Sequence, residues 1–389
     1  MVSGFGIALI VAVGELWSGA SAGVAAQETT LGEPVASRDE AFGLIGGVRE
    51  LPDGSVLVAD PLGGLLVRLD ATLMSMETLG SEGEGPGEYG QPDNIWPVGR
   101  DRSILVDLGN ARLSDVDPDG RIGDGTPIVL PAGEAGRGGM GGMLMALPGG
   151  SDANGHVYFA GSGFGPDGPR DSVELFRLRP GEGEPERVAT LKAPELNVEG
   201  SAGSDMSISR VPMGPVDAWG VAPDGSLFIA RVGDYSVEYV RANGAIRRGE
   251  PVAYRPVGIR MAEKEEWAAE RSRVGGVMID VAMGGGGRRT QMSRSTGGRR
   301  ELAQYDWPDD MPAFTTTRIS VDSDGNGWIR RSTKAGQTAL YDVFNTLGER
   351  VKSVRFPADR TLISFGRGAM YVARIDEFDQ QFLEKYDLP

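Results

Sequence analysis

Cysteine is absent from the sequence and histidine occurs once, and each scarcity excludes a class of chemistry. A chain without cysteine forms no disulfides, has no thiolate nucleophile, ligates no metal through sulfur and offers no acceptor for a lipoprotein anchor. The single imidazole, His156, cannot build a histidine-rich metal site. A Ser-His-Asp hydrolase would have to use the same residue, yet no Gly-x-Ser-x-Gly elbow accompanies it. We therefore expect no catalytic residue and assign His156 to a hairpin.

Basic residues are also fewer than acidic ones, with 39 Lys and Arg against 55 Asp and Glu. The 389 residues carry a formal net charge of -16, which would repel nucleic acid and anionic membranes, so we expect neither as a partner. Aromatic residues make up only 7%, whereas 60 glycines and 24 prolines without a collagen-like period are typical of many tight turns. The hydrophobic content of 40% is sufficient for a large core.

Long hydrophobic runs are missing too. One apolar run, from Phe5 to Val13, is followed by small residues up to Val24, Ala25 and Ala26, a pattern similar to a signal-peptide cleavage site. We predict that residues 1–26 are a signal peptide and that the mature chain is periplasmic or extracellular. A membrane-spanning helix needs roughly 20 apolar residues, so we expect no membrane span after signal removal.

A short unit recurs along the chain: an apolar strand, a glycine-bearing turn, a second apolar strand, a polar break and a third strand. In the first copy the strands are predicted at 48–51, 56–59 and 65–69. Five further copies are predicted over residues 95–116, 157–178, 219–240, 319–344 and 361–386. The turns that mark the units include Asp53-Gly54, Asp119-Gly120, Asn154-Gly155, Asp224-Gly225, Asn243-Gly244 and Asp324-Gly325.

The recurrence predicts an all-β, six-bladed β-propeller over residues 30–389, because radial repetition lets many short strands avoid exposed edges. An extra strand, from about Thr30 to Arg38, could close the ring against the last blade. Turn spacing is uneven: Gly155 to Gly225 is 70 positions and Gly225 to Gly325 is 100, against about 40 to 50 for a blade. Insertions must therefore lie between blades.

The larger insertion, about residues 257–304, separates the fourth blade from the fifth. It begins with an amphipathic helix predicted from Met261 to Arg273. A glycine-rich tract follows, which we interpret as a mobile, disordered loop because it is too polar to bury a core. Its arginines are solvated in this interpretation; the alternative is that they clamp an anionic partner. They are Arg288, Arg289, Arg294, Arg299 and Arg300.

The stretch Gly85-Pro86-Gly87-Glu88-Tyr89, followed by residues 104–107 (Ile-Leu-Val-Asp) and 110–113 (Asn-Ala-Arg-Leu), resembles an NHL repeat. Residues 58–60 (Val-Ala-Asp) look like a second copy that lacks the Asn and Arg. More broadly, the chain resembles the six-bladed β-propeller proteins exported by many bacteria, which carry this loop, a helical insertion before the fifth blade and an Asp-Glu pair in the last, here Asp376-Glu377. The resemblance implies the fold but not the function, since related propellers include enzymes, ligand binders and scaffolds.

The innermost strand of each blade lines the central channel, so its early residues face a mouth where small ligands tend to bind. The candidate ligand-binding residues here are Asp93, Asn94, Asp217, Trp219 and Arg318. These side chains could close a channel with bridging water or hold a small polar ligand. They also resemble the oxygen-rich Ca²⁺ sites of propeller lactonases, where the metal polarises a lactone carbonyl.

Two loops have ligand-binding alternatives. Residues 322–327 imitate the start of a calcium loop, but Thr333 stands at the twelfth position in place of Glu, and the segment lies where the other copies have a hairpin turn. The loop from Gly80 through Glu88 could present backbone N–H groups to an anion, although its own glutamates would repel one. We interpret the first loop as a turn and the second as a connector between blades.

Two functions remain open. The first is a monomeric, non-catalytic exported binding or scaffold propeller that holds a small polar ligand or a protein partner, without a cofactor. The alternative is a Ca²⁺-dependent hydrolase of the lactonase or esterase type, working at the channel mouth.

Overall fold

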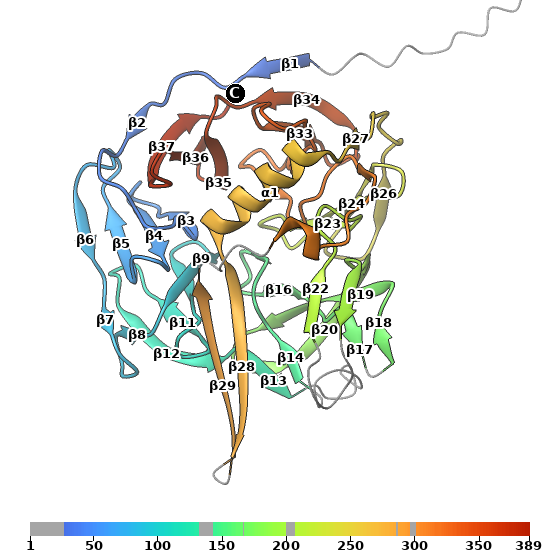
Figure 1. Ribbon diagram of the computed structural model, residues 1–389. Helices are drawn as coiled ribbons and strands as arrows, with labels where there is room; N and C mark the ends of the chain where they lie inside the picture. Colours follow the sequence, from blue (N-terminus) through green and yellow to red (C-terminus); the bar gives the residue numbers. More distant parts are fainter. Residues whose placement is uncertain (1–26, 132–142, 166, 200–206, 285–286, 296–300) are drawn as a thin grey trace, which may run out of the picture.

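Six antiparallel sheets stand around a common axis in the computed structural model, like the blades of a propeller (Figure 1). The structure describes residues 27–131, 143–165, 167–199, 207–284, 287–295 and 301–389. The predicted signal peptide, residues 1–26, lies outside these ranges. The expected all-β, six-bladed propeller is confirmed, with one α-helix before the fifth blade. No helix in the described part of the chain is long and apolar enough to cross a membrane.

The blades follow one another along the chain, each with its strands in order from the axis outward. Blade one comprises β3 (Gly47–Glu50), β4 (Val56–Asp60), β5 (Leu65–Leu69) and β6 (Met76–Thr78). Blade two comprises β9 (Pro92–Val98), β10 (Arg102–Asp107), β11 (Arg112–Val116) and β12 (Ile122–Pro127). Blade three comprises β15 (Gly150–Ser151), β16 (Val157–Ala160), β19 (Ser172–Arg179) and β20 (Glu182–Lys192).

Blade four comprises β23 (Ala218–Val221), β24 (Leu227–Arg231), β25 (Ser236–Val240) and β26 (Ile246–Arg248). Blade five comprises β31 (Ser320–Val321), β32 (Gly327–Arg330), β33 (Leu340–Phe344) and β34 (Arg350–Arg355). Blade six combines β35 (Arg360–Phe365), β36 (Ala369–Ile375) and β37 (Gln381–Asp387) with β2 (Ala36–Ser37). The connections carry short strand pairs: β7 (Ser81–Glu82) with β8 (Glu88–Tyr89), β13 (Val129–Pro131) with β14 (Met143–Met145), β17 (Phe164–Gly165) with β18 (Gly168–Pro169), β21 (Leu196–Glu199) with β22 (Ser207–Arg210), and β27 (Val257–Gly258) with β30 (Asp310–Met311).

Strand β4 shows why these sequences form blades. All five of its residues are buried, and its side chains alternate between the two faces, as a period of two requires. Val56 and Val58 pack toward blade six, whereas Leu57 and Ala59 pack toward blade two. The turn before β4 is closed by the Asp53 carboxylate, which accepts the Ser55 N–H at 2.9 Å, and Gly54 takes the positive φ of 88° that such a turn needs.

The core is divided among the blade interfaces. In the described residues there are six hydrophobic clusters, and each lies between one pair of neighbouring blades around the ring. Near the axis, the first strands contact one another in the closed sequence β3, β9, β15, β23, β31, β35 and back to β3. A fully buried Val or Leu side chain contributes about 2 kcal/mol, so every blade depends on both of its neighbours for its core.

Strand β2, from the first part of the described chain, completes blade six, whose other strands are β35, β36 and β37. Strand β2 pairs antiparallel with β37, with Ala36 opposite Lys385, and the flanking Val35 and Arg38 N–H groups also bond to β37 (Figure 1). This pairing matches the ring closure expected for the segment from about Thr30 to Arg38. Strand β1 (Gln27–Thr30) pairs in parallel with β34 and adds a fifth strand to blade five.

The insertion before blade five contains helix α1 (Met261–Val274), which the sequence predicts to within one residue at its end, and the short 3-10 helix η2 (Leu302–Gln304). The expected mobile loop is wrong over residues 287–295. These residues form β29 (Gly287–Ser295), which pairs along its whole length with β28 (Gly276–Gly284) in a long hairpin (Figure 1). Pairing with β28 satisfies the backbone, and Met292 is buried against blades two and three. Arg299 and Arg300 lie outside the described residues.

Removing residues 1–38 should weaken the ring, because the outer edge of β37 then loses its partner and the buried Leu31 is lost. Several backbone hydrogen bonds at about 1 kcal/mol each, together with Leu31, predict a fall in Tm of roughly 10 °C. The measurement is thermal unfolding followed by circular dichroism. A chain that begins at residue 27 is the control and should melt with the full chain; equal Tm values for all three would contradict closure by β2.

Candidate functional site

The first strands of the blades enclose a channel along the ring axis, and this channel widens into two cavities. One, of about 420 Å³, lies among the turns that join the first and second strands of the blades; we call it the turn-side cavity. The other, of about 250 Å³, is bordered by the β28–β29 hairpin and is called the insertion-side cavity. Asn94, Trp96, Gly149 and Arg318 line both, so they form the boundary between the two halves of the channel.

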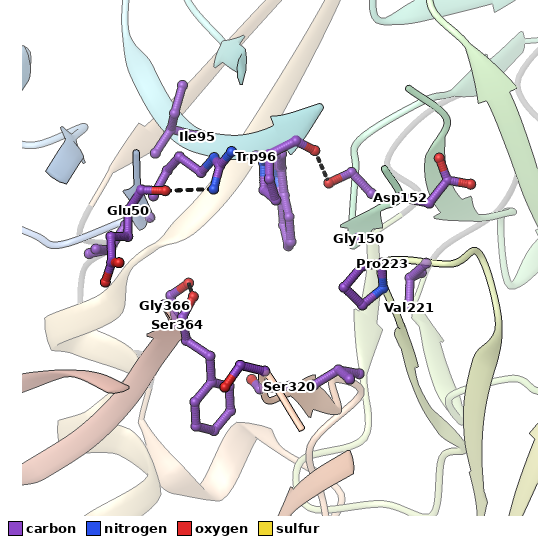
Figure 2. Close-up of a pocket in the computed structure, with 18 of the residues that line it drawn as sticks. Glu50, Ile95, Trp96, Gly150, Asp152, Val221, Pro223, Ser320, Ser364 and Gly366 are labelled. Carbon is purple, nitrogen blue, oxygen red and sulfur yellow. Dashed lines mark hydrogen bonds between the residues drawn. The ribbon is translucent and has the colours of Figure 1, made fainter. Parts of the chain in front are cut away.

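Every blade contributes its first turn to the turn-side cavity (Figure 2). Representative turn residues, one from each blade, are Pro52, Arg100, Asp152, Pro223, Ser323 and Arg367. The wall between them is partly apolar, with Trp96, Val221 and Phe365, and partly hydroxylic, with Ser320 and Ser364. Small-molecule sites commonly have volumes of about 300–1,000 Å³, so this cavity can take a compact organic ligand.

Three carboxylates border the turn-side cavity, and each already has donors from the protein. Glu50 accepts a hydrogen bond from the Tyr371 hydroxyl at 2.7 Å and lies 3.7 Å from Arg367 and 3.8 Å from Lys385. Burial, reinforced by the Glu50 carboxylate, raises the pKa of Tyr371, so this hydroxyl stays protonated and remains a donor. Glu50 is therefore committed to holding blades one and six together.

Asp152 is held within its own hairpin. It accepts the Asn154 N–H at 2.8 Å and the Tyr158 hydroxyl at 2.9 Å, and His156 Nδ1 lies 2.9 Å away. Burial acts to raise the pKa of Asp152, but the bonds from His156 and Tyr158 outweigh it and lower the pKa. His156 thus acts in the structure as a partner of the turn, as expected for a hairpin residue.

Asp322, the first residue of the calcium-like segment, likewise accepts hydrogen bonds from its own hairpin, in blade five. Its carboxylate accepts the N–H groups of Asp324 and Asn326 at 3.0 and 2.8 Å, and the Trp328 indole N–H at 2.8 Å. Because N–H donors point at both oxygens, the lone pairs that a cation would use are occupied. The segment is a hairpin turn in the structure.

Arginines outnumber carboxylates around the turn-side cavity. Those that line it are Arg49, Arg100, Arg318 and Arg367. Arg49 donates to two backbone carbonyls, those of Glu50 at 2.6 Å and Arg100 at 2.8 Å, and its Nε has no hydrogen-bond partner in the described part of the protein. Burial lowers the pKa of Arg49, although the neighbouring Glu50 and Asp101 oppose the shift. The cavity therefore presents an excess of positive charge.

Arg318 is the one of the four that also lines the insertion-side cavity. Its guanidinium carbon is 4.9 Å from the centroid of the Trp96 ring, and one N–H donates to the Ile363 carbonyl at 3.4 Å. In the described chain, no aspartate or glutamate forms an ion pair with it. Burial lowers the pKa of Arg318, but a guanidinium is still protonated at neutral pH. Arg318 is thus a charged group at the centre of the ring with most of its donors unused.

The structure brings four of the five candidate residues to one place. Asp93, Asn94, Trp219 and Arg318 line the insertion-side cavity. Asp217 lines neither cavity: it is buried, accepts the N–H groups of Lys192 at 2.9 Å and Val232 at 3.0 Å, and pairs with Arg231 at 2.8 Å. Asp217 therefore ties blade three to blade four on the outer side of the first strand.

The β28–β29 hairpin covers the insertion-side mouth. Arg294 forms a bidentate ion pair with Asp93, and its backbone N–H and carbonyl bond to the amide of Gln91 at 2.7 and 3.0 Å. Val277, on the other strand of the hairpin, also lines the cavity. Because the hairpin supplies the counter-ion of Asp93, that carboxylate is not free to bind a ligand.

The residues that resemble an NHL repeat form one network in blade two. The buried Asp107 carboxylate accepts N–H groups from Gly90 at 2.9 Å and Gln91 at 3.0 Å, and the Asn110 amide at 2.8 Å. Arg112 lies 3.3 Å from Asp107 and donates to the Glu88 carbonyl at 2.7 Å. Together they fasten the incoming connector to the blade.

Asp60 has the same place in blade one, where it accepts the N–H groups of Gly43, Leu44 and Gly63 at 2.8–2.9 Å. The expected second copy of the motif therefore keeps the function of the aspartate. Because blade one lacks the Asn and Arg, Asp60 binds only the backbone at residues 43–44 and 63.

The connector from Gly80 to Glu88 already holds an anion of its own. The Glu88 carboxylate turns back into the loop and accepts the Gly85 N–H at 2.7 Å. Gly83, at a positive φ of 156°, leaves the space for it, since a Cβ there would overlap the carboxylate. The loop is a connector, and Glu88 fills the place that an external anion would need.

The donor set does not fit the calcium site implied by the lactonase resemblance. In the described part of the chain, no group of three or more His, Asp or Glu residues is arranged to hold a metal ion. Of the two carboxylates expected at the mouth, Asp93 is paired with Arg294 and Asp217 with Arg231. A Ca²⁺ ion needs six to eight oxygen ligands, and guanidinium groups stand where it would have to bind.

Replacing Arg294 by alanine should release the hairpin from the channel mouth, because it removes the bidentate pair with Asp93. A hydrogen-bonded charge pair contributes roughly 1.5–3 kcal/mol, so amide hydrogen exchange over 276–295 should quicken about tenfold or more while the blades are unchanged. Mass spectrometry of exchanged peptides measures this. The control is Arg187→Ala, which removes an exposed pair with Glu174 on blade three; equal exchange in both variants would contradict anchoring by Arg294.

No family model matches the sequence, and no curated protein matches it. Among solved structures, the chain is similar to a member of the DUF4221 family from Bacteroides vulgatus, with a TM-score of 0.51 and 10% identity over 92% of this chain and 98% of that one. A calcium-binding protein, regucalcin, from Agrobacterium tumefaciens has a TM-score of 0.41 and 9% identity over 93% and 96%. A gluconolactonase from Xanthomonas campestris has a TM-score of 0.39 and 13% identity over 93% and 98%. At these identities the comparisons show the propeller fold alone.

Proposed function

We propose that the protein is a non-catalytic binding propeller that acts outside the cytoplasm and holds a small polar ligand in its turn-side cavity. One observation carries the proposal: a cavity of about 420 Å³ on the ring axis, formed by all six blades, whose carboxylates are committed to the protein while Arg318 is not. A preformed concave site with a few convergent polar groups is the usual form of a small-molecule site.

Export is inferred from the apolar run before residue 27, which is followed by small residues as in a signal peptide. The NHL-type character of blade two is supported by the joint action of Asp107, Asn110 and Arg112, which explains why the three occur together. Both features describe a scaffold. The kind of ligand is inferred from the residues that line the turn-side cavity.

A calcium-dependent hydrolase is the weaker candidate. It would need oxygen ligands that converge on one point, and the aspartates expected to supply them are bound by arginines. A protein partner on a propeller face is a further alternative, but the volume of the cavity, about 420 Å³, favours a small molecule.

A fragment screen tests the proposal directly. Ligand-observed NMR with a mixed library of neutral and charged fragments should yield binders, and Ser364→Trp, which fills the cavity, should abolish most of them. Ser172→Trp, at an exposed position on blade three, is the matched control and should leave binding unchanged. Absence of binders, or binders indifferent to Ser364→Trp, would refute a ligand site in this cavity.

Calcium should have little effect on stability. A site occupied at a hundredfold excess over its Kd adds about 2.7 kcal/mol, which would raise Tm by several degrees. We expect a change below about 1 °C when millimolar CaCl₂ or EDTA is added, because arginines occupy the carboxylates. Differential scanning calorimetry makes the measurement, and a Tm that rises by several degrees and is lost in Asp93→Asn would restore the metal-dependent alternative.

A further inference from the structure

The chemistry around Arg318 also suggests which class of ligand the cavity takes, an inference that rests on the proposed function. Arg318 lines both cavities, so its guanidinium can be reached from the turn-side opening. Its face is stacked over Trp96 and only one N–H is bonded, to the Ile363 carbonyl. A stacked guanidinium keeps its edge free, and that edge matches the two oxygens of a carboxylate or phosphate.

The described part of the protein offers Arg318 no free carboxylate. Glu50 is bound by Tyr371 and faces Arg367, and the other two cavity carboxylates are saturated by donors of their own hairpins. In the described residues, the three carboxylates of this wall therefore have donors of their own, whereas Arg318 has no carboxylate partner. A guanidinium that lines a cavity and has no carboxylate partner in the described part of the chain is a ready binding group for an anion.

The rest of the wall indicates the shape of that anion. Near Arg318 the cavity is bordered by the Trp96 ring, Val221, Pro223 and Phe365. These surfaces favour an apolar body, since moving apolar surface out of water is favourable. Arg49, which retains an unused Nε, adds a second positive group toward the rim.

We propose that the turn-side cavity binds a small organic oxyanion, a carboxylate or phosphate attached to a compact apolar group, with Arg318 pairing with the anionic end and Trp96, Val221, Pro223 and Phe365 contacting the body. The ligand enters from the turn side, because the β28–β29 hairpin covers the other mouth.

Three probes with a common phenyl group test the charge requirement: benzoate, phenyl phosphate and the neutral benzamide. Titrations followed by NMR should show at least tenfold tighter binding of one or both anions than of benzamide. Arg318→Gln should remove this preference, Arg318→Lys should restore part of it, and Arg241→Gln, at an exposed turn of blade four, should leave it unchanged. Circular dichroism confirms that each variant is folded, and the comparison of the three probes on the unaltered protein needs no variant.

The outcomes separate the two proposals. Equal affinity for benzoate, phenyl phosphate and benzamide, all lost in Ser364→Trp, would overturn the oxyanion inference and leave the ligand site standing. An anion preference that persists in Arg318→Gln would overturn the assignment to Arg318. Failure of all three probes to bind would overturn the oxyanion inference, and the fragment screen then decides the proposed function by itself.

Discussion

Burial of apolar faces between neighbouring blades is the interaction on which the whole molecule depends. A four-stranded blade is apolar on both sides, as β4 shows with Val56 and Val58 on one face and Leu57 and Ala59 on the other. No blade can cover both faces alone, so each is stable only between two others, and a row of blades is complete only when it closes. Six interfaces with one cluster each are the result, and the axis of the ring becomes the natural place for a cavity.

Buried carboxylates lie between the blades, where backbone N–H groups of the connecting segments have no partner in a sheet. Asp60, Asp107 and Asp217 each use a buried carboxylate to bind N–H groups of the segments that connect blades. Glu88 does the same inside its own loop. A chain with a net charge of -16 thus employs several of its acids as internal acceptors, while Arg318, in the described residues, has no carboxylate partner.

Much of the fold could be predicted because its signals are local. The bounds of β5 follow from one apolar run, and the Asp-Gly and Asn-Gly turns lie where the sequence predicts them. The β28–β29 hairpin could not be predicted, because a polar tract forms a strand only when a partner strand is present. The burial of Met292 depends likewise on residues of blades two and three, which are distant in the sequence. Asp217 is expected at the channel since it immediately precedes a first strand, yet Arg231 and Lys192 draw its carboxylate outward. Arg49 and Arg367 could not be predicted as cavity residues from the sequence, because only the structure shows that they line the turn-side cavity and that the hairpin covers the opposite mouth.

The pairing of β2 with β37 in blade six determines when the propeller ring can close during folding. Strand β2 comes from residues 36–37 and its partner β37 from residues 381–387, so the sixth sheet is complete only when these two distant segments have met. Contacts between residues this far apart form late and slowly. The sixth interface cannot be completed before these two segments have met, so the other five interfaces can form while the ring is still open.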